Sequence, residues 1–104
     1  MAIVELSVVP IGTAGTSVSD YVAAIHDVLA KEKDVTFTLT PMSTVIEGEL
    51  NTLWPLLRRL HEVPFPHGAQ RVYTTIKIDD RRDKLATMTG KIASVRNKTA
   101  KVRD

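Results

Sequence analysis

The sequence predicts an α+β fold of the ferredoxin-like type, in which a four-stranded antiparallel sheet carries two helices on one face. Two patterns lead to this prediction: four segments alternate in the manner of half-buried strands, and two others repeat apolar residues at helical spacing. Their order along the chain is β-α-β-β-α-β, with an extra C-terminal helix, and this order is the ferredoxin-like pattern. A chain of 104 residues suits one compact domain, which we place at residues 1–104.

The first half of the chain predicts a strand, a helix and a second strand. Residues 2–11 are rich in β-branched side chains and alternate, so positions 4, 6 and 8 share a buried face. Apolar residues at helical spacing follow over 18–29, with Ser17 or Ser19 as the N-cap. Residues 36–40 alternate strictly and place three threonines on one face of the second strand.

The second half begins with a hairpin turn after Pro41, which leads into a third strand over residues 44–49. A helix then starts with Asn51 or Thr52 as its cap and has Pro55 in its first turn, where proline costs least.

The remaining elements are a strand and a helix. Residues 71–79 alternate and predict the fourth strand, and residues 84–98 predict the last helix. That helix carries a narrow apolar stripe of Leu85, Met88, Ile92 and Val95. Its other face repeats lysine every seven residues, at Lys84, Lys91 and Lys98.

Composition limits the class of protein. The chain is 43% hydrophobic and 25% charged, and it has no apolar run near the roughly 20 residues that span a bilayer, so we expect no membrane contact. It has no cysteine and begins without a signal-peptide pattern, so we expect a cytoplasmic protein. Residues 71–104 carry 10 Lys and Arg against 4 Asp and Glu, but Tyr73 is their only aromatic residue. An RNA-binding module is therefore the least favoured interpretation.

The histidines do not form a known catalytic or metal-binding pattern. His26, His61 and His67 lack the HExxH spacing, and the chain has no GxSxG elbow. We therefore expect no enzymatic activity, no metal and no cofactor. The acidic and basic residues at 79–83 are interpreted as an ion-pair cluster rather than a phosphate clamp.

Glu47 is the unusual residue of the third strand, because it places a carboxylate in a segment otherwise suited to a sheet interior. Either Glu47 faces solvent or pairs with a nearby arginine, or it anchors a ligand.

The face of the sheet opposite the two helices is predicted to be open. Its expected lining is polar with one aromatic residue, and comprises Glu5, Ser7, Thr36, Thr38, Thr40, Tyr73, Thr75 and Lys77. Because an uncovered sheet commonly acquires a second layer by assembly, we expect a homo-oligomer, a dimer or tetramer, that buries Thr36, Thr38, Thr40 and Tyr73.

Four segments resemble the small, single-domain members of the thiamine-binding, YkoF-like family. These are ELSVVPIGT at 5–13, SDYVAA at 19–24, TVIEGE at 44–49 and RVYTTIKIDDRRD at 71–83. The resemblance spans nearly the whole chain and implies a ferredoxin-like fold, assembly through the sheets, and non-catalytic binding of thiamine or its hydroxymethylpyrimidine half. One departure is in the turn, where Met42 and Ser43 stand at a position at which relatives often carry glycine.

Thiamine has a permanent cationic ring and an aminopyrimidine with donor and acceptor edges, so its pocket needs a carboxylate, hydroxyls and an aromatic or apolar wall. The residues expected to supply these groups are Glu5, Ser7, Thr44, Glu47, Tyr73 and Thr74. The resulting hypothesis is an oligomeric carrier or sensor of a thiamine-like molecule. The alternative is a structural or regulatory oligomer without a small-molecule ligand.

Overall fold

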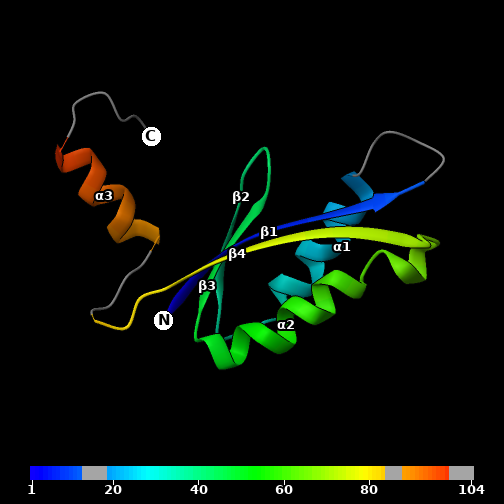
Figure 1. Cartoon of the computed structure of the whole chain (residues 1–104), viewed down its shortest axis with the longest axis horizontal. Coiled ribbons are helices and arrows are strands. Elements are labelled where there is room, and N and C mark those ends of the chain that lie inside the picture. The colour runs from blue at the N-terminus through cyan, green and yellow to red at the C-terminus, as the bar shows by residue number, and fades with distance from the viewer. Residues whose placement is uncertain (13–18, 84–87, 99–104) are drawn as a thin grey trace.

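The structure is a computed structural model, and it describes residues 1–12, 19–83 and 88–98. Its elements follow the predicted order (Figure 1). They are β1 (Ala2–Ile11), α1 (Ser19–Ala30), β2 (Thr36–Leu39), β3 (Thr44–Gly48), α2 (Leu50–Glu62), a 3-10 turn (Phe65–His67), β4 (Arg71–Asp80) and α3 (Met88–Lys98). The predicted first strand has the observed bounds, and the other described elements begin or end within a few residues of their expected limits. The proposed cap Ser17 and the residues 84–87 of the predicted last helix lie outside the described residues.

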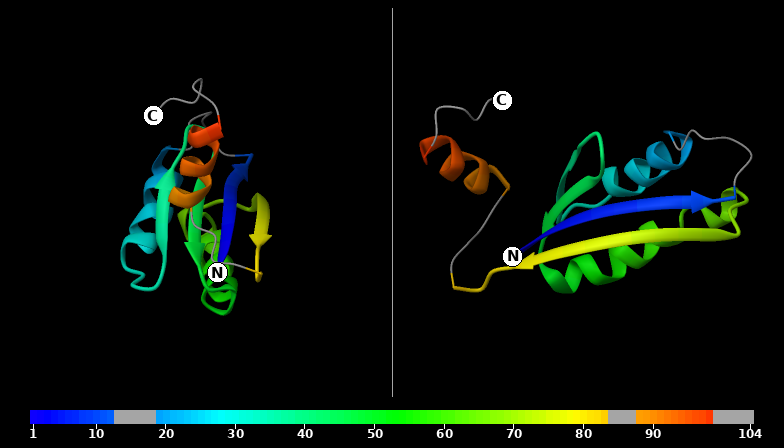
Figure 2. Two further views of the ribbon diagram at one scale, coloured as in Figure 1. Left: turned by 90° about the vertical axis from the view of Figure 1, so that its left-hand side faces the viewer. Right: turned by 45° about the horizontal axis from the view of Figure 1, so that its top comes forward.

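The four strands form one antiparallel sheet in the order β2-β3-β1-β4. This order confirms the ferredoxin-like prediction, because the first and third strands lie side by side at the centre. Helices α1 and α2 cover the same face of the sheet, and none of the described helices lies over the opposite face (Figure 2).

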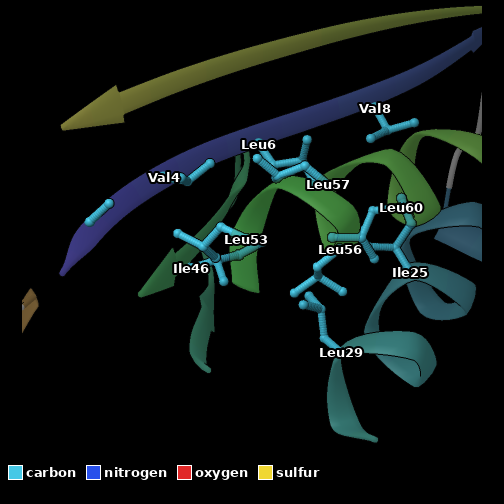
Figure 3. Packing of buried hydrophobic residues seen from close by; sticks show 11 residues of the cluster. Val4, Leu6, Val8, Ile25, Leu29, Ile46, Leu53, Leu56, Leu57 and Leu60 are labelled. Atoms are coloured by element: carbon cyan, nitrogen blue, oxygen red, sulfur yellow. The ribbon is translucent and has the colours of Figure 1, made fainter. Parts of the chain in front are cut away.

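The core lies between the sheet and the two covering helices (Figure 3). Alternate residues of β1 point toward the helices because side chains change face at every residue of a strand. The largest contribution comes from α2, whose leucines at i, i+3, i+4 and i+7 are buried. The buried cluster contains Ala2, Val4, Leu6, Val8, Ile25, Leu29, Ile46, Leu53, Leu56, Leu57 and Leu60.

The N-cap of helix α2 lies two or three residues earlier than predicted. This cap is Glu49, which makes no side-chain capping hydrogen bond, so Asn51 and Thr52 lie inside the helix and do not cap it. The prediction that Pro55 falls in the first turn is therefore wrong, because a helix that begins at Leu50 places Pro55 in its second turn.

The open face has the composition that the alternation predicts, with one exception. Glu5 lies beside Lys77, Thr36 beside Glu47, and Tyr73 is 62% exposed. Thr40 is the exception: it follows the end of β2, and its hydroxyl bonds to Ser43 within the hairpin turn. Three of the four residues predicted to be buried by assembly therefore share this face.

Helix α3 stands apart from the rest of the protomer (Figure 1). Lys91 of this helix pairs with Asp79 at the end of β4. Ile92 and Val95, which belong to the predicted apolar stripe, are 46% and 50% exposed. Their stripe is therefore not covered by the rest of the chain that the structure describes.

Candidate functional site

The candidate site forms where two strands of the sheet separate. The pairing of β1 with β3 runs from Ala2–Gly48 to Leu6–Thr44 and then stops. The pairing of β1 with β4 continues to Ile11–Arg71, so residues 7–11 have a strand partner on one side only. The tip of the β2-β3 hairpin turns away from β1 toward α1 (Figure 2).

A pocket of about 990 Å³ lies between β1, α1 and this hairpin tip. Its walls are mainly apolar, with hydroxyl groups and one imidazole among them. The described lining residues are Leu6, Ser7, Val8, Val9, Ser19, Val22, Ala23, Ile25, His26, Leu39, Thr40, Pro41, Met42, Ser43 and Thr44. No carboxylate occurs in this described lining.

The hairpin tip is held in shape by one threonine. The Thr40 hydroxyl accepts hydrogen bonds from the main-chain N–H of Met42 at 3.3 Å and of Ser43 at 3.0 Å. The Thr40 N–H donates to the Ser43 carbonyl at 2.8 Å. These bonds fix the turn without a glycine, and they leave the Met42 side chain 86% exposed at the rim of the pocket.

His26 and Thr44 form the polar pair of the pocket. The Nε2 atom of His26 lies 3.2 Å from the Thr44 hydroxyl, and the imidazole packs edge-on against Phe37 with the ring centres 5.2 Å apart. Thr44 is buried, and His26 is half-buried. Sequence reasoning gave His26 no role at this site. Its position next to Ile25, on the sheet-facing side of α1, is the signal that could have identified it.

The six predicted ligand residues do not converge on one site. Thr44 lines the pocket from the helix-facing side of β3, and Ser7 borders it from β1, although strand alternation places the Ser7 side chain on the open face. Thr74 faces the helices but outside the described pocket lining, where its hydroxyl lies 2.7 Å from Nδ1 of His61.

The other three predicted residues, Glu5, Glu47 and Tyr73, lie on the open face of the sheet. Glu5 pairs with Lys77 at 3.7 Å, and Glu47 accepts a hydrogen bond from the Thr36 hydroxyl at 3.4 Å. Strand alternation explains the separation, because odd-numbered residues of β1, β3 and β4 point away from the helices.

The charged segment after β4 forms ion pairs, as the sequence analysis interprets it. Arg81 contacts Asp83, and Arg82 contacts Asp80 at 2.8 Å. The hydrogen bond from Arg82 lowers the pKa of the Asp80 carboxyl below its ordinary value. These pairs occupy both arginines, so the described segment offers no ready phosphate clamp.

The described residues offer neither a metal site nor a membrane-spanning helix. In residues 1–12, 19–83 and 88–98, no three His, Asp or Glu side chains gather in a way that could hold a metal ion. None of the described helices has the length and apolar character required to cross a bilayer.

The fold and the pocket define a small α+β domain with a pocket where its two central strands separate. The chain belongs to the thiamine-binding protein family, whose pattern matches residues 4–96. A relative from Bacillus subtilis, the UPF0045 protein YqgV, is 48% identical over 98 residues, which cover 91% of this chain and 94% of that protein. A UPF0045 protein of Methanothermobacter thermautotrophicus is 42% identical and covers 94% of this chain and 99% of its own length.

Solved structures support the same fold. The protein MJ1052 of Methanocaldococcus jannaschii superposes with a TM-score of 0.80 at 33% identity, over 90% of this chain and 94% of that one. A candidate thiamine biosynthesis/salvage protein of Thermotoga maritima, TM0486, gives a TM-score of 0.74 at 17% identity, over 90% of this chain and 97% of that one. The second likeness, at this low identity, concerns the fold alone.

Proposed function

We propose that this protein binds thiamine or its hydroxymethylpyrimidine half without catalysis, in the pocket between β1, α1 and the hairpin tip. The observation that carries the proposal is the coincidence of this pocket with membership in the thiamine-binding family. The volume of about 990 Å³ lies within the usual range of small-molecule sites.

The lining matches the chemistry of a substituted aromatic ring. Val22, Leu39 and Met42 provide apolar surface for the faces of the ring. The His26–Thr44 pair offers hydrogen-bonding groups for its edge. A few well-placed polar groups on apolar walls are typical of sites that orient a small ligand.

The family relationship and the pocket support binding rather than turnover. The lining offers one imidazole bonded to a hydroxyl, without a carboxylate in the described residues to orient it. A nucleophile activated by a histidine requires such a third group in most known arrangements. We therefore propose a carrier or sensor.

Blocking the pocket tests the proposal directly. Ala23 lies on an exposed position of α1 and lines the pocket, so Ala23→Trp fills the pocket without disturbing the core. Ala30→Trp, also at an exposed position of α1 but outside the lining, is the matched control. Calorimetric titration with thiamine and with hydroxymethylpyrimidine is expected to show binding by the wild type and the control and none by Ala23→Trp. Absence of binding by the wild type would remove the proposal.

A second arrangement places the cationic part of thiamine on the open face, beside Glu47 and Glu5. This arrangement is favoured by the two carboxylates, which lie on that face of neighbouring strands. If it is correct, Glu47→Gln weakens thiamine binding by about 1.5–3 kcal/mol, the value of a hydrogen bond to a charged group. Equal affinity of Glu47→Gln and wild type, together with loss of binding in Ala23→Trp, places the ligand in the pocket.

A further inference from the structure

We infer that the main-chain N–H and C=O of Val8 read the amino edge of a pyrimidine ring in this pocket, an inference that rests on the proposed function. It assigns the specificity of the site to the backbone of β1 rather than to a side chain.

The hairpin establishes the direction in which the main-chain N–H and C=O groups of β3 point. In an antiparallel pair, both main-chain groups of a residue point to the same neighbouring strand, and successive residues alternate between the two sides. The hydrogen bond from Thr40 N–H to the Ser43 carbonyl shows that Ser43 points toward β2. Since the β2-β3 register runs without interruption, Thr44 points the other way, toward β1.

The same alternation continues into β1. Leu6 is the partner of Thr44, so its main-chain groups point toward β3. The main-chain groups of Ser7 then point toward β4, and those of Val8 point toward the β3 side again. If the β1-β3 register continued for two more residues, Met42 would lie opposite Val8. The pairing has already ended there, and the Met42 N–H is bonded to the Thr40 hydroxyl instead.

Pro10 supports this assignment. By the same alternation it also points toward the side that β3 has left. A proline within a sheet is tolerated where its missing N–H faces an unpaired edge, because no ladder hydrogen bond is then lost. The proline therefore occupies the side of β1 on which no strand follows.

Val8 is consequently held firmly with its polar edge toward the pocket. The residue as a whole is 7% exposed, its side chain belongs to the core cluster, and it lines the pocket. A donor and an acceptor of one residue stand side by side there, as they do toward a neighbouring strand.

An aminopyrimidine presents the complementary pair, because its exocyclic amino group donates next to a ring nitrogen that accepts. The amino group would donate to the Val8 carbonyl, and the ring nitrogen would accept from the Val8 N–H. A pyrimidine with an oxo group in place of the amino group reverses both roles, so it would set acceptor against acceptor and donor against donor. The site would therefore bind aminopyrimidines more tightly than oxopyrimidines.

Amide NMR with hydroxymethylpyrimidine as the probe tests the contact itself. The Val8 amide is expected to move downfield and to become protected from hydrogen exchange on titration, whereas the Ser7 and Val9 amides, which point toward β4, keep their exchange rates. A Val8 amide that neither shifts nor gains protection at saturation would overturn the inference.

Two comparisons measure the specificity. Val8→Ala and Val8→Pro both lose side-chain packing, but the proline variant also loses the N–H, so it is expected to bind the probe about two- to tenfold more weakly than the alanine variant. The oxo analogue is expected to bind the wild type more than about tenfold more weakly than the amino compound, and this arm remains decisive if Val8→Pro does not fold.

These outcomes separate the two proposals. If neither thiamine nor hydroxymethylpyrimidine binds the wild type, both the function and the inference fail. If they bind, but the oxo analogue binds equally well and the Val8 amide is unaffected, the function stands and the role of Val8 is excluded.

Discussion

Gly48 shows how a single residue sets the distance between elements. A Cβ atom at this position would lie 2.9 Å from Cγ1 of Val35 and 3.4 Å from the carbonyl oxygen of Asp34, with Leu53 at 3.6 Å. The absence of a side chain therefore lets β3 approach the segment before β2 and the start of α2.

Gly48→Ala is expected to lower the free energy of unfolding by about 1–2 kcal/mol, because overpacking exceeds the entropy that alanine removes from the unfolded chain. Urea denaturation measures the change. In a Val35→Ala background the same substitution should cost less, since its closest clash is then gone. An equal cost in both backgrounds would show that the Asp34 carbonyl, rather than Val35, resists the added methyl group.

Single residues also mark the limit of what the sequence could predict for the site. Ser7 and Thr44 were expected at the site, and both border the pocket. Glu47 attracted attention because a carboxylate stands among apolar residues, yet alternation alone places it on the open face with Thr36. The role of His26 was missed because its partner Thr44 comes from a distant strand, although its place beside Ile25 on the buried side of α1 was a signal in the sequence. The main chain of Val8 could not be identified, because its role depends on where two strands separate.

At the level of elements, Pro55 makes a stabilising substitution available. It lies in the second turn of α2 on an exposed position, where proline removes a helix hydrogen bond and its ring crowds the preceding turn. Pro55→Ala is expected to raise the free energy of unfolding by about 1–3 kcal/mol, after subtraction of the entropy that proline removes from the unfolded chain.

Arg58→Ala, at another exposed position of the same helix, is the control and should change stability by less than about 0.5 kcal/mol. Urea denaturation of both variants provides the measurement. A Pro55→Ala protein no more stable than the control would indicate that α2 bends around the sheet and has already relieved the strain.

The strands and α2 could be predicted because their periods are strong. Residues 2–11 alternate at every position, and the leucines of α2 keep helical spacing over about three turns, so burial agrees with local pattern. The start of α2 was misplaced because Asn51 and Thr52 are good caps by composition, whereas the observed cap Glu49 is not bonded through its side chain. The apolar stripe of α3 predicted a helix but gave no information about what the stripe packs against.

Viewed as a whole molecule, the protomer exposes two surfaces that a second copy could cover. The open face carries Val9, Ile11 and Tyr73, which are 39%, 39% and 62% exposed, at one end of the β1-β4 pair. Helix α3 exposes Ile92 and Val95. The radius of gyration is 15.2 Å, against about 13 Å for a compact domain of this length, because α3 projects from the protomer.

Assembly through the open face remains a prediction, and Tyr73 is the residue that tests it. We expect light scattering at micromolar concentration to give the mass of a dimer or tetramer. Tyr73→Asp should shift that mass to a monomer, because the new charge would be buried in the contact without a partner.

Trp54→Asp is the matched control, since Trp54 is also an aromatic residue and 52% exposed, but it lies on α2 and not on the open face. This variant should keep the wild-type mass. A monomeric wild type would exclude assembly altogether, and a monomeric Trp54→Asp protein beside an oligomeric Tyr73→Asp protein would move the interface to the helical layer. Ligand titrations on monomeric Tyr73→Asp then separate ligand binding from assembly. The pocket lies between the sheet and α1 within one chain, so its affinity for the ligand should not depend on assembly.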